Sequence, residues 1–163
     1  DTGDSIEKIK IKSSGIYGYF NKESKCYKIY QPHSKKNKFT KVHEHLQGLE
    51  QLTYKKDYLI ITSSLKDGMC IDSFGFNLEF IAPHSENTII KPHIIHSLKQ
   101  KYKKVLSLFD NDEAGHTAME TYKNVYDIDG VYIKSEKDIS DAVKKYGADA
   151  VKPKLFNLIK SSI

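Results

Sequence analysis

The chain has 163 residues, enough for one domain or for two small subdomains that share a core. Its net charge is +5, and all 26 basic residues are lysines, which excludes an arginine finger or an arginine–guanine contact within this chain. It has neither an apolar run of about 18 residues nor a signal-peptide pattern, so we expect a soluble, intracellular protein without a membrane partner.

The charge indicates the kind of partner, and the cysteines indicate which structural sites are absent. Excess positive charge favours a polyanion, and lysines contact phosphate as point charges, so a nucleic acid would be held through its backbone. Cys26 and Cys70 lie far apart and form no CxxC pair, which argues against a zinc site or a disulfide framework. The chain begins with Asp rather than Met, and we expect it to be a piece of a longer protein.

Residues 1–56 are expected to form a small, basic, β-rich subdomain. Two runs rich in tyrosine and lysine flank the turn-like stretch 21–25, which predicts a hairpin over residues 16–31. A third short strand is predicted around Phe39.

From Asp57 the pattern alternates between strands and helices up to residue 150. Short apolar runs predict four strands, at residues 58–62, 78–82, 104–109 and 130–133. Helices are predicted between and after them, at residues 65–74, 92–102, 113–124 and 140–146, with Met69 and Cys70 on the apolar side of the first. Residues 151–163 are expected to add a C-terminal helix that begins at Pro153. The fold class is therefore α/β, with a parallel four-stranded sheet flanked by helices.

The sharpest chemical feature is the segment Phe109-Asp110-Asn111-Asp112-Glu113-Ala114-Gly115, which follows a predicted strand and opens a helix. Ligands of open α/β sheets bind beyond the carboxyl ends of the strands, so Asp110 and Asp112 can face one pocket. Carboxylates about 4 Å apart repel by roughly 4 kcal/mol at an effective dielectric of 20, and a hard cation such as Mg²⁺ removes that repulsion. The simpler interpretation is a helix N-cap beside a loop aspartate.

Further acids follow the other strands. Asp67 comes after the first, Glu86 after the second, and Glu136, Asp138 and Asp141 after the fourth. Parallel strands end at one edge of a sheet, so we expect these carboxylates at the same rim as Asp110 and Asp112. Asp141 is the least secure of them, because the helix dipole stabilises an acid in a first turn in any case.

These residues resemble the TOPRIM domain of bacterial and phage DNA primases, topoisomerases and some nucleases. The strand–Asp-x-Asp-x-x-Gly–helix unit and the preceding strand–turn–helix with an acid in its first turn carry the resemblance over residues 57–150. The segments 28–32, 38–39 and 46–49 are similar to the basic subdomain that precedes TOPRIM in phage-type primases, and Lys137-Asp138 with Asp141 is similar to their third acidic motif. This favours a primase over the other classes.

The resemblance implies a DNA-templated RNA polymerase that makes primers on single-stranded DNA from nucleoside triphosphates, with Mg²⁺ or Mn²⁺. It implies two-metal phosphoryl transfer, with Asp110 and Asp112 as the main ligands and Asp67, Glu86 and Asp138 as further ones. A replicative helicase, separate or fused, is an expected partner. The alternatives are another TOPRIM enzyme, either a nuclease or a topoisomerase-like protein, and a catalytically weakened nucleic-acid-binding module.

One position departs from the family. The usual glutamate at the tip of the first strand, four residues before Asp67, is Ser63 here. Our hypothesis is that Glu86 supplies the missing carboxylate; a weakened or lost catalytic centre is the alternative.

Lysines and aromatic residues suggest where nucleic acid binds. In the N-terminal part, Lys28, Tyr30 and Lys38 are candidates to bind a single strand, with lysines along the phosphates and aromatic rings against the bases. A tyrosine-rich core with charged loops explains the same pattern. Lys66 and Lys137 stand beside the acids and are candidates for nucleotide phosphates, although a solvated lysine is an equally good interpretation.

Overall fold

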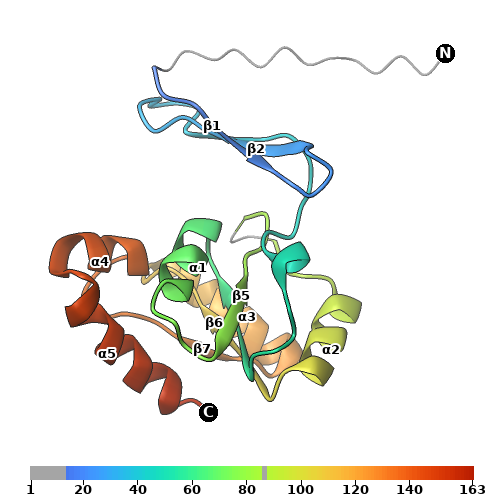
Figure 1. Ribbon diagram of the computed structural model, residues 1–163, viewed down its shortest axis with the longest axis vertical. Coiled ribbons are helices and arrows are strands. Elements are labelled where there is room, and N and C mark those ends of the chain that lie inside the picture. Colours follow the sequence, from blue (N-terminus) through green and yellow to red (C-terminus); the bar gives the residue numbers. More distant parts are fainter. Residues whose placement is uncertain (1–13, 86–87) are drawn as a thin grey trace. The chain divides into compact units, whose positions relative to one another are not determined.

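The computed structural model describes residues 14–85 and 88–163, and the chain divides into two compact units, Asp1–His45 and Leu46–Ile163. Each unit has a sheet of its own, as Figure 1 shows. The predicted α/β class, with a four-stranded parallel sheet and a separate small β-rich part, is confirmed.

The first unit contains a three-stranded antiparallel sheet in the order β1-β2-β3, formed by Tyr17–Phe20, Cys26–Tyr30 and Phe39–Lys41. The side chain of Asn21 closes the turn between β1 and β2, because its Oδ1 accepts hydrogen bonds from the amides of Glu23 and Lys25. The predicted hairpin and third strand are therefore both present.

The second unit contains four parallel strands in the order β5-β4-β6-β7. They are β4 (Tyr58–Thr62), β5 (Leu78–Ile81), β6 (Lys104–Leu108) and β7 (Asp129–Val131). The central strand β4 pairs on both sides, with Ile60 opposite Phe80 of β5 and opposite Leu106 of β6.

Helices cover both faces of this sheet (Figure 1). On one face lie α1 (Leu65–Asp72), α4 (Ile139–Tyr146) and α5 (Ala148–Lys160), and on the other lie α2 (Pro92–Lys101) and α3 (Glu113–Tyr126). Side chains of a strand alternate between faces, so Ile60 packs with the first group of helices, and Leu59 and Ile61 pack with the second. Both faces of the sheet are buried, which explains the continuous apolar run of β4.

Two details differ from the sequence-based expectation. Helix α5 begins at Ala148, five residues before Pro153, because Val151, Leu155 and Ile159 form one buried stripe at helical spacing. Met69 is 60% exposed, whereas Ile71 on the same helix is fully buried. The inward face of α1 is formed by Asp67, Gly68 and Ile71, and Met69 points away from it.

A buried carboxylate fixes the segment that leads into β4. Glu79 of β5 is 7% exposed and accepts hydrogen bonds from the amides of Thr53 and Tyr54 at 2.7 and 3.0 Å, from the Thr53 hydroxyl at 2.6 Å and from the Tyr102 hydroxyl. Burial favours the protonated acid, but these four donors outweigh it and lower the pKa of Glu79. In the described part of the chain, no helix has the length and apolar character needed to cross a membrane.

Candidate metal centre

Three helices begin at the carboxyl edge of the parallel sheet. Helix α1 starts at the N-cap Ser64 after β4, α3 at the N-cap Asp112 after β6, and α4 at the N-cap Asp138 in the segment after β7. Each N-terminus presents backbone N–H groups and the positive end of a helix dipole. This edge can therefore hold carboxylates and phosphate groups close together.

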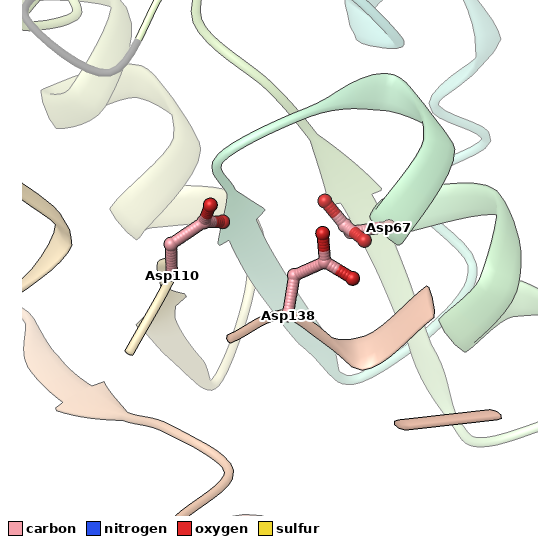
Figure 2. Close-up of side chains that lie close together, drawn as sticks. All are labelled: Asp67, Asp110 and Asp138. Atoms are coloured by element: carbon pink, nitrogen blue, oxygen red, sulfur yellow. The ribbon is translucent and has the colours of Figure 1, made fainter. Parts of the chain in front are cut away.

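Asp67, Asp110 and Asp138 converge at this edge, as Figure 2 shows. One carboxylate oxygen of each lies within 4.8 Å of one from each of the other two. Oxygen ligands at this spacing suit a hard divalent cation such as Mg²⁺ or Mn²⁺, and such an ion would relieve the repulsion between the acids. The donor set therefore fits the metal that the resemblance implies.

Asp110 is placed by a close backbone contact. It follows β6 after the buried Phe109, and a Cβ on Gly115 would lie 2.0 Å from the Asp110 carbonyl oxygen. Only glycine lets the first turn of α3 approach so closely, which gives a physical reason for the glycine of the Asp-x-Asp-x-x-Gly motif. Burial and then the neighbouring Asp67 raise the pKa of Asp110, although a hydrogen bond from Ser63 opposes this.

Serine hydroxyls surround Asp67, which is 2% exposed. Its Oδ2 accepts a hydrogen bond from Ser64 and lies 3.3 Å from the Ser63 hydroxyl oxygen, and its Oδ1 accepts a hydrogen bond from the hydroxyl of Ser140. The amide of Asp67 in turn donates to Ser64 Oγ, so the two residues form a capping pair at the start of α1. Both carboxylate oxygens thus have donors, which stabilises a charge that burial would otherwise disfavour.

Asp112 and Asp138 share one arrangement. In each, Oδ1 caps a helix, accepting from the Gly115 amide at 2.9 Å or from the Asp141 amide at 2.7 Å. In each, Oδ2 faces a lysine, with Asp112 2.9 Å from Lys137 Nζ and Asp138 3.3 Å from Lys66 Nζ. The Gly115 amide and then Lys137 lower the pKa of Asp112.

Lys137 bridges the two aspartates of the motif, because its Nζ also lies 3.4 Å from Asp110 Oδ2. The carboxylate of Asp112 and then that of Asp110 raise the pKa of Lys137, so this lysine is charged at neutral pH. Lys66 reaches Asp138, and its pKa is raised because the carboxylates of Asp67 and Asp138 outweigh its partial burial. Asp110 and Asp112 thus contact the same lysine, but Asp112 stands outside the cluster of three.

Two predicted features concern the position of the missing glutamate. Ser63 lies inside the cluster, with its hydroxyl 2.6 Å from Asp110 Oδ1. Glu86 lies outside the residues that the structure describes, so its proposed part in the centre stays a prediction. Asp141 is exposed, and its amide donates a hydrogen bond to Oδ1 of the N-cap Asp138.

The first unit presents aromatic rings and lysines on one face of its sheet. Tyr17, Tyr30 and Phe39 are paired across the three strands, and Tyr30 stacks on Phe39 with ring centroids 4.6 Å apart. The next row on the same face pairs Tyr19, Lys28 and Lys41. Phe39 is 51% exposed and Tyr17 is 59% exposed, so this face offers rings to a ligand.

Two of the three residues of this unit that are candidates to bind nucleic acid lie together on the aromatic face. Tyr30 and Lys28 lie on the aromatic face, with Lys28 Nζ 4.7 Å from the centre of the Phe39 ring. Burial and then Lys41 lower the pKa of Lys28. Lys38 is exposed just before β3, and its carbonyl oxygen accepts from the Gln31 amide at 2.7 Å.

Sequence reasoning named Ser63 only as the replacement of a glutamate, and it did not predict the hydrogen bonds that three serines make to the acids. Ser63, Ser64 and Ser140 supply the hydroxyls that hold Asp67, and Ser63 also holds Asp110. The spacing Ser64-x-x-Asp67 is a capping-box pattern and could have indicated one of these contacts. The contact of Ser140 with Asp67 joins residues 73 positions apart, so no local pattern announces it.

Solved structures share this fold. The chain is similar to the catalytic domain of a DnaG primase bound to single-stranded DNA, at 18% identity and a TM-score of 0.61, over 87% of this chain and 52% of that one. It is also similar to the zinc-binding and RNA polymerase domains of the Aquifex aeolicus primase, at 19% identity and a TM-score of 0.60, over 90% of this chain and 39% of that one. The chain has a primase-like TOPRIM fold. The primase fragment of the bacteriophage T7 primase-helicase is a third such structure, at 14% identity and a TM-score of 0.62, over 88% and 62%.

The likeness is one of fold and covers part of each relative. This primase-like chain spans between 39% and 62% of the length of those three structures. No family model matches its sequence, and no curated protein does either.

Proposed function

We propose that the chain is part of a DNA primase and that residues 46–163 carry its metal-dependent nucleotidyl-transfer site. The observation that carries the proposal is the convergence of Asp67, Asp110 and Asp138 at the carboxyl edge of a sheet with the primase fold. A divalent ion held there, Mg²⁺ or Mn²⁺, supplies charge neutralisation and lowers the pKa of the attacking primer 3′-hydroxyl.

The chain's own residues have separate parts in this proposal. Asp67, Asp110 and Asp138 hold the ion, with Asp112 as a further ligand when its lysine partner moves aside. Lys66 and Lys137 are each 57% exposed at the side chain and stand beside the acids, so they can reach the phosphates of a bound nucleotide. The N-termini of α1, α3 and α4 add backbone N–H groups at the same edge.

A cavity next to Asp112 is a suitable place for the incoming nucleoside triphosphate. It has a volume of about 610 Å³ and runs along α3 from Asp112 to Thr121, with Ala114, Thr117 and Ile89 in its lining. Small and hydroxyl-bearing side chains leave room for a sugar and offer it hydrogen bonds. A nucleotide in this cavity would have its phosphates near Lys137.

The aromatic face of the first unit is proposed to hold the single-stranded template. Base stacking on Tyr17, Tyr30 and Phe39 needs no particular sequence, and lysines such as Lys28, Lys38 and Lys41 contact the phosphates. Because the chain spans only part of its primase relatives, template choice and a link to a helicase belong to the whole protein. We propose that this protein acts in the cytoplasm of a bacterial cell or a phage-infected host.

The decisive experiment is primer synthesis by the full-length protein. Labelled nucleoside triphosphates and single-stranded DNA are incubated with Mg²⁺ or Mn²⁺, and chelation is expected to stop chain growth. Asp110→Asn and Asp67→Asn should each abolish synthesis, because each removes a charged ligand from a cluster of three. The exposed Asp149→Asn in the first turn of α5 is the matched control and should retain activity.

The products separate the proposal from its alternatives. Cleavage of the DNA without chain growth would support a TOPRIM nuclease instead. A catalytically weakened binding module is the second candidate, and Ser63 favours it because a neutral side chain replaces the family's acidic ligand. That module would bind DNA but would neither extend nor cut it.

A further inference from the structure

We propose that this centre holds one divalent ion and that the ammonium group of Lys137 takes the place of a second one between Asp110 and Asp112. This inference rests on the proposed metal-dependent function and changes how many ions it needs. The resemblance implies a two-metal site, whereas the contacts of this chain describe a one-metal site completed by a lysine.

The contacts of Lys137 are those of a bridging cation. Its Nζ lies 2.9 Å from Asp112 Oδ2 and 3.4 Å from Asp110 Oδ2. The opposite oxygens of the two acids are already committed, since Asp112 Oδ1 caps α3 and Asp110 Oδ1 accepts from Ser63. Each acid therefore directs its remaining oxygen to the same ammonium group.

The main chain fixes Lys137 beside the motif. Its carbonyl oxygen accepts a hydrogen bond of 2.6 Å from the amide of Asn111, the residue between the two acids. Asn111 is held in turn by His116, whose Nε2 lies 3.0 Å from Asn111 Oδ1. The backbone of Lys137 is thus hydrogen-bonded to the loop whose two acids its ammonium group contacts. This distinguishes Lys137 from a lysine that is merely near an acid.

The charges of the centre leave room for one ion. Among the residues that the structure describes, the centre has four carboxylates, those of Asp67, Asp110, Asp112 and Asp138, which carry −4 when ionised. Lys66 and Lys137, the two lysines paired with them, carry +2. The remaining charge of −2 equals that of one divalent cation, and a second ion would have to displace or repel the Lys137 ammonium.

The remaining ion position is the cluster of three. Asp67, Asp110 and Asp138 each offer an oxygen within 4.8 Å of the others, and Asp112 does not belong to this group. Ser63 fills the position of the family's glutamate with a hydroxyl, so the acids of the described residues at this edge suit one ion rather than two. Asp110 is the residue common to both positions.

The test is a count of bound Mn²⁺ by calorimetry and by paramagnetic resonance, on the full-length protein without nucleotide. The wild type is expected to bind one ion at this centre. Lys137→Met keeps the length of the side chain but removes its charge, and it should bind two. Lys137→Arg keeps the charge and should return the count to one, and the exposed Lys134→Met should leave it at one.

The outcomes separate the inference from the function on which it rests. Two ions in the wild type, or one ion in both the wild type and Lys137→Met, would overturn the inference while the metal-dependent function stands. Failure of the wild type and the variant to bind any ion would overturn the proposed function itself. If Lys137→Met does not fold, as judged by its circular dichroism, Lys137→Gln provides the same count.

Discussion

The hydroxyl oxygen of Ser63 lies 2.6 Å from Oδ1 of Asp110 and 3.3 Å from Oδ2 of Asp67. A neutral hydroxyl group thus stands between two buried carboxylates at the tip of β4, where the resembling family has a glutamate. The hydroxyl proton can be donated to only one carboxylate at a time, and the shorter distance favours Asp110. Ser63 therefore lowers the repulsion of the ion-free centre and at the same time removes a possible ligand.

Ser63→Glu should strengthen metal binding. A fourth carboxylate among the ligands is expected to raise Mn²⁺ affinity by about tenfold, equivalent to about 1.4 kcal/mol, as measured by calorimetry. Without metal the same variant should melt at a lower temperature than the wild type, and Mn²⁺ should reverse the loss, because carboxylates crowded without a cation repel. Ser63→Gln has nearly the same size without the charge and should show no gain. Equal affinities for the two variants would refute this account.

Much of the fold could be predicted from the sequence because its signals are local. The apolar run of β4 indicates a strand buried on both faces, and Gly115 after Asp110 and Asp112 indicates a tight strand–helix turn. The start of α5 could not be read in the same way. Proline favours the first turn of a helix, which made Pro153 an attractive start. The burial of Val151, two residues before Pro153, depends on tertiary packing, which a single sequence does not display.

The candidate site was predictable only in outline. Parallel strands end at one edge, so the gathering of Asp67, Asp110 and Asp138 follows from topology. The different positions of Asp110, inside the cluster, and Asp112, outside it, do not follow from topology. They depend on which oxygen caps α3 and on the reach of Lys137. The contact of Ser140 with Asp67 was equally out of reach, because it requires knowing that α1 and α4 begin side by side.

Gly115→Ala should disrupt the motif. The new Cβ would lie 2.0 Å from the Asp110 carbonyl oxygen, a backbone atom that cannot rotate away. Overpacked sites typically lose about 1–3 kcal/mol in the free energy of unfolding, and we expect a loss near the upper end of that range in urea denaturation. Mn²⁺ binding should weaken as well, because Asp110 is displaced. Gly15→Ala is the control, because its nearest neighbour would be 3.6 Å away. Unchanged stability and metal binding in Gly115→Ala would contradict the close contact.

Glu79→Gln should destabilise the second unit. The amide group would turn an N–H donor toward donors at Thr53, Tyr54 or Tyr102 and would leave one of them unsatisfied. The expected loss is about 1–3 kcal/mol in the free energy of unfolding, and Tyr102→Phe should cost about 1 kcal/mol. The control Glu120→Gln lies exposed on α3. A Glu79→Gln protein as stable as this control would show that the four donors contribute nothing.

Acid should remove the contribution that the Asp129 carboxylate makes to the free energy of unfolding. Hydrogen bonds from Lys104 and Lys123, at 2.7 and 2.8 Å, lower the pKa of Asp129 from its ordinary 3.8 to about 2. Because the folded pKa is the lower one, the unfolded chain binds the proton first, so this contribution is present above pH 3.8 and is lost as the pH falls from there through 2. The side chain is 37% exposed, so solvent screening reduces the effect to about 1 kcal/mol.

The measurement compares the thermal stability of Asp129→Asn with that of the wild type across this pH range. The variant should be less stable at neutral pH, and the difference should vanish as the pH falls below 2, where the wild-type carboxyl is protonated in the folded protein as well. Glu120→Gln again serves as the control for loss of an acidic charge. A difference that stays constant with pH would mean that Asp129 acts through packing rather than through its charge.

The aromatic face of the first unit predicts which rings bind the template. Tyr30→Ala and Phe39→Ala should each weaken binding of a labelled single-stranded oligonucleotide by about 1–3 kcal/mol, roughly 5- to 150-fold, because each removes a stacking surface. Phe20→Ala is a matched control. Phe20 is 61% exposed, but its ring lies over the position where Gly18 would carry a Cβ, on the other side of β1 from Tyr17 and Tyr19. Lysine–phosphate contacts should make all of these affinities fall steeply between about 50 and 200 mM salt, with the same slope in the stacking variants. An equal loss in Phe20→Ala, or binding that does not respond to salt, would rule out this face as the template platform.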